Sequence, residues 1–149
     1  KQDYGGLTEV AKIERTNDKL INLMYRILYN KDIRENSLSL HTILISLENI
    51  ADRYRDICLI AKEKKILLSK ELENFIKEMN DFYHHLVQIY YKFDQDKIVE
   101  IKEKRQQIEK KGMLLSEKIK KEEIPLLHHL LSVAHIYKDI ELTLGFESD

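Results

Sequence analysis

From Leu40 to Ala61 the chain runs Leu-His-Thr-Ile-Leu-Ile-Ser-Leu-Glu-Asn-Ile-Ala-Asp-Arg-Tyr-Arg-Asp-Ile-Cys-Leu-Ile-Ala. Apolar side chains recur in it every three or four residues, a spacing that gathers them on one side of an α-helix. The positions on that side are Leu40, Ile43, Leu44, Leu47, Ile50, Ala51, Tyr54, Ile57, Cys58 and Ala61. The stretch therefore predicts a long amphipathic helix, for which Asn36 or Ser37 offers an N-cap.

The same period continues on both sides of this stretch. It predicts four more helices, from Thr8 to about Asn30, after the N-cap Ser69 to about Tyr90, from Asp94 or Asp96 to Ile119, and from Pro125 onward. Gly112 lies inside one of them and should weaken it by about 1 kcal/mol relative to alanine. The fold class expected is all-α, an antiparallel bundle of about five long helices. A single extended coiled coil is the alternative, but the apolar sides are wide, which favours the bundle.

Composition excludes most other fold classes. The 149 residues include only four glycines and one proline, too few for the frequent turns of a β-sandwich or for a glycine-rich phosphate loop. Lys and Arg number 25 against 26 Asp and Glu, so the near-zero net charge argues against a nucleic-acid-binding fragment. No apolar run approaches the length of a membrane span, and the lone Cys58 rules out an intrachain disulfide. A cytoplasmic protein is expected, and the first residue, Lys1, suggests a trimmed chain.

Two segments can be aligned without a gap. Leu47–Ile57 matches Leu130–Ile140, with Tyr-Arg-Asp-Ile in the first and Tyr-Lys-Asp-Ile in the second. The match predicts a duplicated unit within one domain, 1–149, with a first repeat at 8–67 and a second at 68–149. The second repeat then has three helices and the first only two, so the leading helix of the first repeat is missing.

Three acids follow one ridge of the predicted helix at 40–61. Glu48, Asp52 and Asp56 are four residues apart, so their like charges repel one another unless something compensates. Arg55 follows Asp52 by three positions, whereas Glu48 and Asp56 have no basic residue three or four positions after them. A metal cation could bind such a ridge; the alternatives are a solvated acidic face or pairing with bases on a neighbouring helix. Glu14 and Asp18 repeat the spacing.

The segment Leu47–Ile57 resembles the Leu-Glu-Arg-Ile-Gly/Ala-Asp-His-x-x-Asn-Ile segment of PhoU, the phosphate-uptake regulator. Ile13-Glu-Arg and Asp18-Lys-Leu resemble the helix that precedes it there, and PhoU proteins consist of two three-helix repeats. The resemblance implies that Glu48 and Asp52, with Asp56 as a possible addition, are ligands for iron or zinc. In the second repeat Leu131 and His135 occupy the positions of Glu48 and Asp52, so His135 and Asp139 are weaker candidate ligands.

The resemblance also implies a function. A PhoU-like chain would be a non-enzymatic negative regulator of phosphate uptake or signalling, acting on phosphate ABC transporter components or phosphate-responsive proteins at the inner face of the membrane, without inserting into it. The alternative is a helical scaffold with no metal and no phosphate role; a metal-dependent hydrolase ranks lowest. If a leading helix is missing, apolar surface is left open, and a homodimer is expected.

Other polar groups indicate less. We expect the pairs His84-His85 and His128-His129 to be surface or interface histidines and not ligands of one metal ion, because adjacent side chains of a helix point about 100° apart. Lysines and Arg105 alternate with glutamates between 100 and 111, which indicates a solvated face.

Overall fold

The computed structural model describes residues 6–30, 37–92 and 95–146. It contains α1 (Gly6–Asn30), α2 (Ser37–Glu63), α3 (Lys70–Tyr91), α4 (Gln95–Leu115), the 3-10 turn η1 (Lys121–Glu123) and α5 (Ile124–Phe146). In these ranges there is no strand, so the predicted all-α class is confirmed. None of the described helices is long and apolar enough to cross a membrane.

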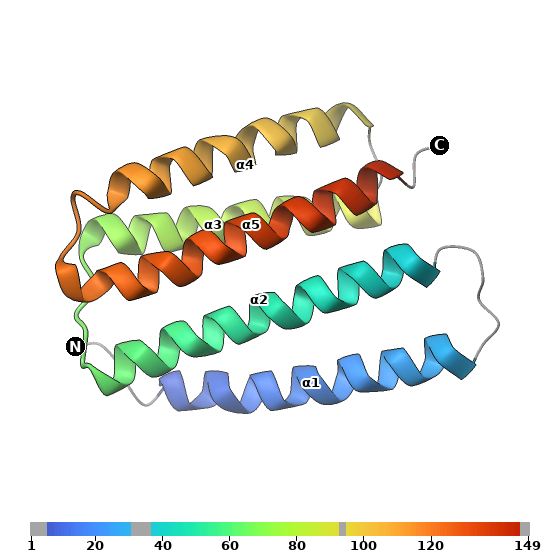
Figure 1. The fold of residues 1–149 in the computed structure, drawn as a ribbon, viewed down its shortest axis with the longest axis horizontal. Helices are drawn as coiled ribbons and strands as arrows, with labels where there is room; N and C mark the ends of the chain where they lie inside the picture. The colour runs from blue at the N-terminus through green and yellow to red at the C-terminus, as the bar shows by residue number, and fades with distance from the viewer. Residues whose placement is uncertain (1–5, 31–36, 93–94, 147–149) are drawn as a thin grey trace.

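Successive helices run in opposite directions (Figure 1). The central pair is α2 and α5; α4 packs on α5, α3 packs on both α4 and α5, and α1 packs mainly on the outer side of α2. The predicted boundary between the two repeats, at 67/68, lies in the short link between α2 and α3. The arrangement is an antiparallel bundle with α1 at its margin.

The core lies among α2, α3, α4 and α5. Its largest fully buried side chains include Phe75, Met79, Leu126, Leu130 and Tyr137. Among the described side chains of α1, only Ile21 is buried. α1 therefore packs against the bundle along one side only, and most of its described apolar side chains stay in contact with solvent.

Local signals fix several helix ends. The Ser69 hydroxyl accepts a hydrogen bond from the Leu72 amide and caps α3, and Pro125 lies in the first turn of α5, both as predicted. The fourth helix is shorter than predicted. It ends at Leu115, and the amides of Lys118 and Ile119 turn back to the Leu115 carbonyl.

A glutamate that sequence reasoning missed joins two links at one end of the bundle. The fully buried Glu123 accepts hydrogen bonds from the Ser69 amide, in the α2–α3 link, and from the Lys120 amide at 2.9 Å. Lys120 in turn donates to the Leu67 carbonyl at 3.2 Å. Because a buried carboxylate is costly unless hydrogen-bonded, this contact sets the position of α3 relative to α5.

Arg105 corrects the prediction of a solvated basic face on the fourth helix. Its side chain is buried between α4 and α5, where Nε lies 2.7 Å from Glu141 and Nη1 lies 2.7 Å from Glu109. Burial alone would lower the pKa of Arg105, but the hydrogen bonds to the two glutamates hold it above the usual value. The charge can be buried because Glu141 comes from α5 to join Glu109 of α4, and periodicity within one helix does not reveal the partner on the other.

Candidate functional site

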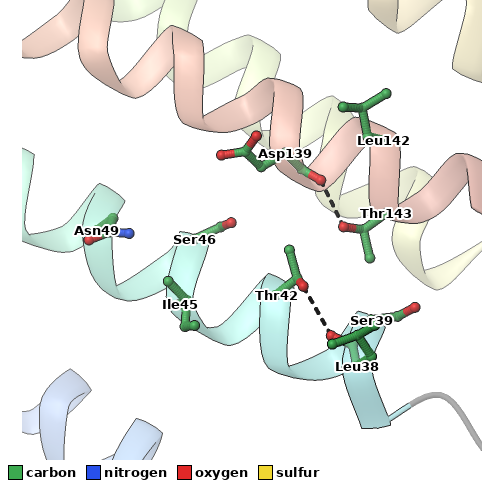
Figure 2. Close-up of a pocket in the computed structure, with 9 residues that line it drawn as sticks. All are labelled: Leu38, Ser39, Thr42, Ile45, Ser46, Asn49, Asp139, Leu142 and Thr143. Atoms are coloured by element: carbon green, nitrogen blue, oxygen red, sulfur yellow. Dashed lines mark hydrogen bonds between the residues drawn. The ribbon is translucent and has the colours of Figure 1, made fainter.

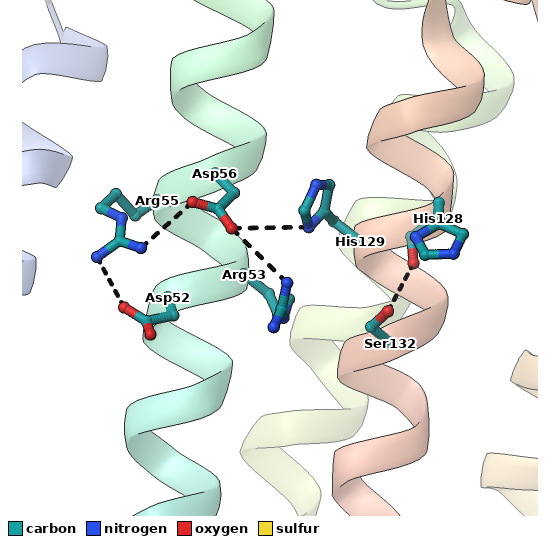
Figure 3. A network of polar contacts seen from close by, with 7 residues as sticks. All are labelled: Asp52, Arg53, Arg55, Asp56, His128, His129 and Ser132. Carbon is teal, nitrogen blue, oxygen red and sulfur yellow. Dashed lines mark hydrogen bonds and ion pairs between the residues drawn. The ribbon is translucent and has the colours of Figure 1, made fainter.

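The acids of the predicted ridge lie on α2, in contact with basic groups (Figure 3). Asp52 forms an ion pair with Arg55, whose Nη1 lies 2.8 Å from the Asp52 carboxylate. Nη2 of the same guanidinium lies 3.3 Å from the Asp56 carboxylate. Asp56 also lies 3.7 Å from Arg53 and 3.9 Å from the His129 Nδ1 of α5. Asp56 has no basic residue three or four positions after it, but its partners precede it on α2 or lie across on α5, in line with the alternative of pairing with a neighbouring helix.

The structure does not assemble the predicted metal ligands into a cluster. No group of three or more His, Cys, Asp or Glu side chains that could hold a metal occurs among the described residues. A cation at Asp52 and Asp56 would have to displace the guanidinium groups of Arg53 and Arg55 from their carboxylates. In this arrangement the two aspartates do not fit a metal, and Glu48 is a half-buried neighbour one turn away that makes no ion pair with a described residue.

The weaker candidates are scattered. Asp18 is half-buried on α1, and its backbone carbonyl accepts a hydrogen bond from Asn22. Glu14 lies on α1, but its side chain is outside the described residues. His135 is exposed on α5, while Asp139, one turn later, borders a cavity between α5 and α2. The carboxylates and the imidazole thus do not converge.

His129 is the group most affected by its surroundings at this interface. Its Nδ1 is buried and has no hydrogen-bond partner among the described residues, since Asp56 is too far away for a hydrogen bond. Burial, with Arg53 and His128 nearby, lowers the pKa of His129 in spite of the Asp56 charge. The imidazole is therefore neutral at pH 7, as expected of an interface histidine.

The cavity between α2 and α5 has a volume of about 450 Å³, within the range of ligand pockets. Its polar lining is Ser39, Thr42, Ser46 and Asn49 from α2, with Asp139 and Thr143 from α5 (Figure 2). Sequence analysis missed it, although a signal exists: the four polar residues of α2 follow one another at intervals of three, four and three. That row runs beside the apolar side of the helix.

A second, apolar hollow lies where α1, α2 and α3 meet. This groove, of about 350 Å³, is lined by residues that include Met24 of α1, Leu40 and Leu47 of α2, and Tyr83, Val87 and Tyr91 of α3. Next to it α1 exposes five large apolar side chains, here called the α1 face: Ile13, Leu20, Leu23, Met24 and Ile27, each 40% to 67% exposed. Ile13, Leu20 and Ile27 are seven residues apart, the spacing of a helix-packing seam.

Comparisons with known proteins give the chain no relative. No family model, no curated protein and no solved structure matches it.

Proposed function

We propose that this chain is a non-catalytic regulatory module that acts by binding other proteins. The observation that carries the proposal is the α1 face together with the neighbouring groove. Contiguous exposed apolar surface at this scale marks interaction sites, whereas scattered single apolar residues do not. Here the exposed residues share one side of one helix and border a groove whose walls are also apolar.

The narrower form of the proposal is control of phosphate uptake or phosphate signalling at the cytoplasmic side of the membrane. It is supported by the resemblance of Leu47–Ile57 to PhoU, and by the pairing of that segment with its internal match, since α2 and α5 are packed against each other. The partners proposed are phosphate ABC transporter components or phosphate-responsive signalling proteins. Iron or zinc at Glu48 and Asp52 belongs to this form, on condition that the metal displaces Arg55 from Asp52.

A second candidate is a helical scaffold without metal or phosphate role. The specific observation that favours it is the neutralisation of Asp52 and Asp56 by Arg53 and Arg55. In a scaffold these charges need no further ligand, whereas a metal site would leave two displaced guanidinium groups beside the cation. Both candidates bind partners through the α1 face. They differ in whether the acids of α2 bind a metal.

The test of the interaction role is crosslinking in cells grown with and without phosphate, followed by identification of the captured transporter or signalling components. Leu20→Glu places a charge in the middle of the α1 face and should abolish the crosslinks. Met113→Glu, a matched change at an exposed apolar residue of α4, should leave them intact. Crosslinks to phosphate-transport proteins that persist in Leu20→Glu would refute the assignment to α1.

The test of the metal is the metal content of the protein purified after growth with added iron or zinc. Wild type should retain metal, and the double variant Glu48→Ala with Asp52→Ala should lose it. Metal retained equally by both would remove these residues as ligands, and metal-free wild type would favour the scaffold.

Self-association is part of the proposal because the α1 face can pair with itself. In an antiparallel pair of α1 helices centred on Leu20, Ile13 of each copy lies opposite Ile27 of the other, which closes a two-fold dimer. Sedimentation at tens of micromolar should give a dimer for wild type and a monomer for Leu20→Glu. A wild-type monomer at that concentration would contradict the dimer but not the binding of other proteins.

A further inference from the structure

We propose that the cavity between α2 and α5 binds an organic cation of the alkylammonium or alkylguanidinium class. Its polar lining offers hydrogen-bond acceptors and one carboxylate, and none of the described lining residues is basic. A ligand that brings donors and a positive charge is the chemical complement of such a lining.

Two of the hydroxyl groups that line the cavity can only accept a hydrogen bond from a ligand. Thr42 Oγ1 donates its proton to the Leu38 carbonyl at 3.0 Å, and Thr143 Oγ1 donates to the Asp139 carbonyl at 2.8 Å (Figure 2). A hydroxyl has one proton, so each threonine has only lone pairs left for a ligand. These oxygens therefore favour ammonium or guanidinium groups over anions.

Ser46 is the second feature of the cavity that points to a ligand. The residue is only 3% exposed, yet its hydroxyl has no hydrogen bond with any described residue. Figure 2 shows this hydroxyl pointing from α2 toward α5, on the side where the Asp139 carboxylate lies. The Ser46 oxygen is not among the fully buried polar atoms that lack a partner, so it is accessible from the cavity and free to hydrogen-bond with a ligand.

The internal match of the two helices supplies a comparison within the same molecule. In the alignment of Leu47–Ile57 with Leu130–Ile140, Asp56 corresponds to Asp139, and one further residue at the N-terminal end pairs Ser46 with His129. Each aspartate therefore faces the equivalent position of the opposite helix. At Asp56 that position holds a neutral imidazole, and Arg53 and Arg55 supply two cations (Figure 3).

At Asp139 the same three positions form no ion pair with the carboxylate among the described residues. Ser46 replaces the imidazole, Ile136 stands where Arg53 does, and Lys138, the match of Arg55, is exposed. Asp139 has no ion pair with any residue that the structure describes. The Ser46 position and the exposed carboxylate of Asp139 thus border the same cavity. A small organic cation would occupy the space beside Ser46 and would balance the charge of Asp139.

Two probes test the proposal on the full chain by amide NMR shifts: 1,4-diaminobutane, and a blocked tripeptide Leu-Arg-Leu. At about 10 mM, tenfold above a weak millimolar Kd, at least one should shift the amides of 38–49 and 139–143. Response to the diamine alone identifies a free amine as the ligand, and a stronger response to the peptide identifies a protein side chain. 1,4-Butanediol, equal in size but neutral, should give no shift. An equal shift with butanediol, or none with either cation, would overturn the proposal.

Variants locate the binding. Asp139→Asn should weaken it by about tenfold or more, because a charge-assisted hydrogen bond is lost. Ser46→His reproduces the Asp56–His129 arrangement and should abolish binding by filling the cavity, while the fold, checked by circular dichroism, is retained. Glu103→Gln, an exposed acid of α4, should bind as wild type does. Unchanged affinity in both Asp139→Asn and Ser46→His would overturn the site.

Discussion

The ion pair between Arg105 and Glu141 should be a main determinant of stability. The side chains of Arg105 and Glu141 are 7% and 6% exposed, and the Nε–Oε2 distance is 2.7 Å. Removing one partner of a buried pair costs about 3–5 kcal/mol, since the other charge remains buried without compensation. Glu109 still contacts the guanidinium in Glu141→Ala, so we expect the lower end, about 3 kcal/mol. That corresponds to a fall in Tm of about 6–12 °C for a domain of this size.

The measurement is urea unfolding followed by circular dichroism at 222 nm, with the midpoint converted to a free energy of unfolding. The control is Lys104→Ala, because the Lys104–Glu100 pair lies on the same helix with both side chains 42% and 51% exposed; no measurable loss is expected. A double variant, Arg105→Met with Glu141→Leu, should recover most of the loss, because apolar side chains of similar size need no counter-charge. A loss below about 1 kcal/mol in Glu141→Ala, or a double variant worse than the single one, would refute the reasoning.

Three further predictions concern single positions. Gly112→Ala should destabilise the protein by about 1 kcal/mol net, since the added Cβ would lie 2.6 Å from Leu131 Cδ2 and 2.8 Å from Phe75 Cζ, outweighing the helix propensity gained; higher stability in urea would contradict this. Tyr137→Phe should change the free energy of unfolding by less than about 1 kcal/mol, because the buried Tyr137 hydroxyl interacts with the Tyr54 hydroxyl without forming a hydrogen bond of good geometry; a larger loss in calorimetry would contradict this. The pKa of His129 is lowered in the fold, so the stability it contributes is present at pH 7.5 and decreases as the pH falls below about 6.5; His129→Gln should flatten that part of the pH profile.

The helices could be predicted from the sequence because each carries its own signal. Helix period, the Ser69 cap and Pro125 are local features, and the structure agrees with them. Gly112 shows the limit of that approach. Propensity marks it as a weak point in a helix, whereas the structure shows that it allows α4 to approach Phe75 and Leu131 closely.

The candidate sites depended on contacts between helices, and most of these could not be predicted. Pairing of Asp56 with a base on a neighbouring helix was one of the alternatives from the sequence, but only the packing of α5 on α2 identifies that base as His129. Arg105 resembled its solvated neighbours in the sequence, and only the position of Glu141 explains its burial. The helical spacing of Ser39, Thr42 and Ser46 could be seen in the sequence. That they line a cavity could not be predicted, because the other wall of the cavity comes from α5.

The energetics of the α1 face limit what can bind there. Full burial of a Leu, Ile or Met side chain contributes about 1.5–3 kcal/mol, and the five residues of the α1 face are each about half exposed. Covering them contributes on the order of 5 kcal/mol, near the lower limit of the roughly 4–15 kcal/mol that association costs. A partner that covers this face alone without burying apolar side chains of its own would therefore bind weakly, whereas a second copy of the chain buries its own five residues too and doubles the gain. Stable binding of a partner without such side chains requires that partner to enter the groove beside Met24 and Tyr83 as well, so substitutions on α1 and in the groove should weaken one and the same complex.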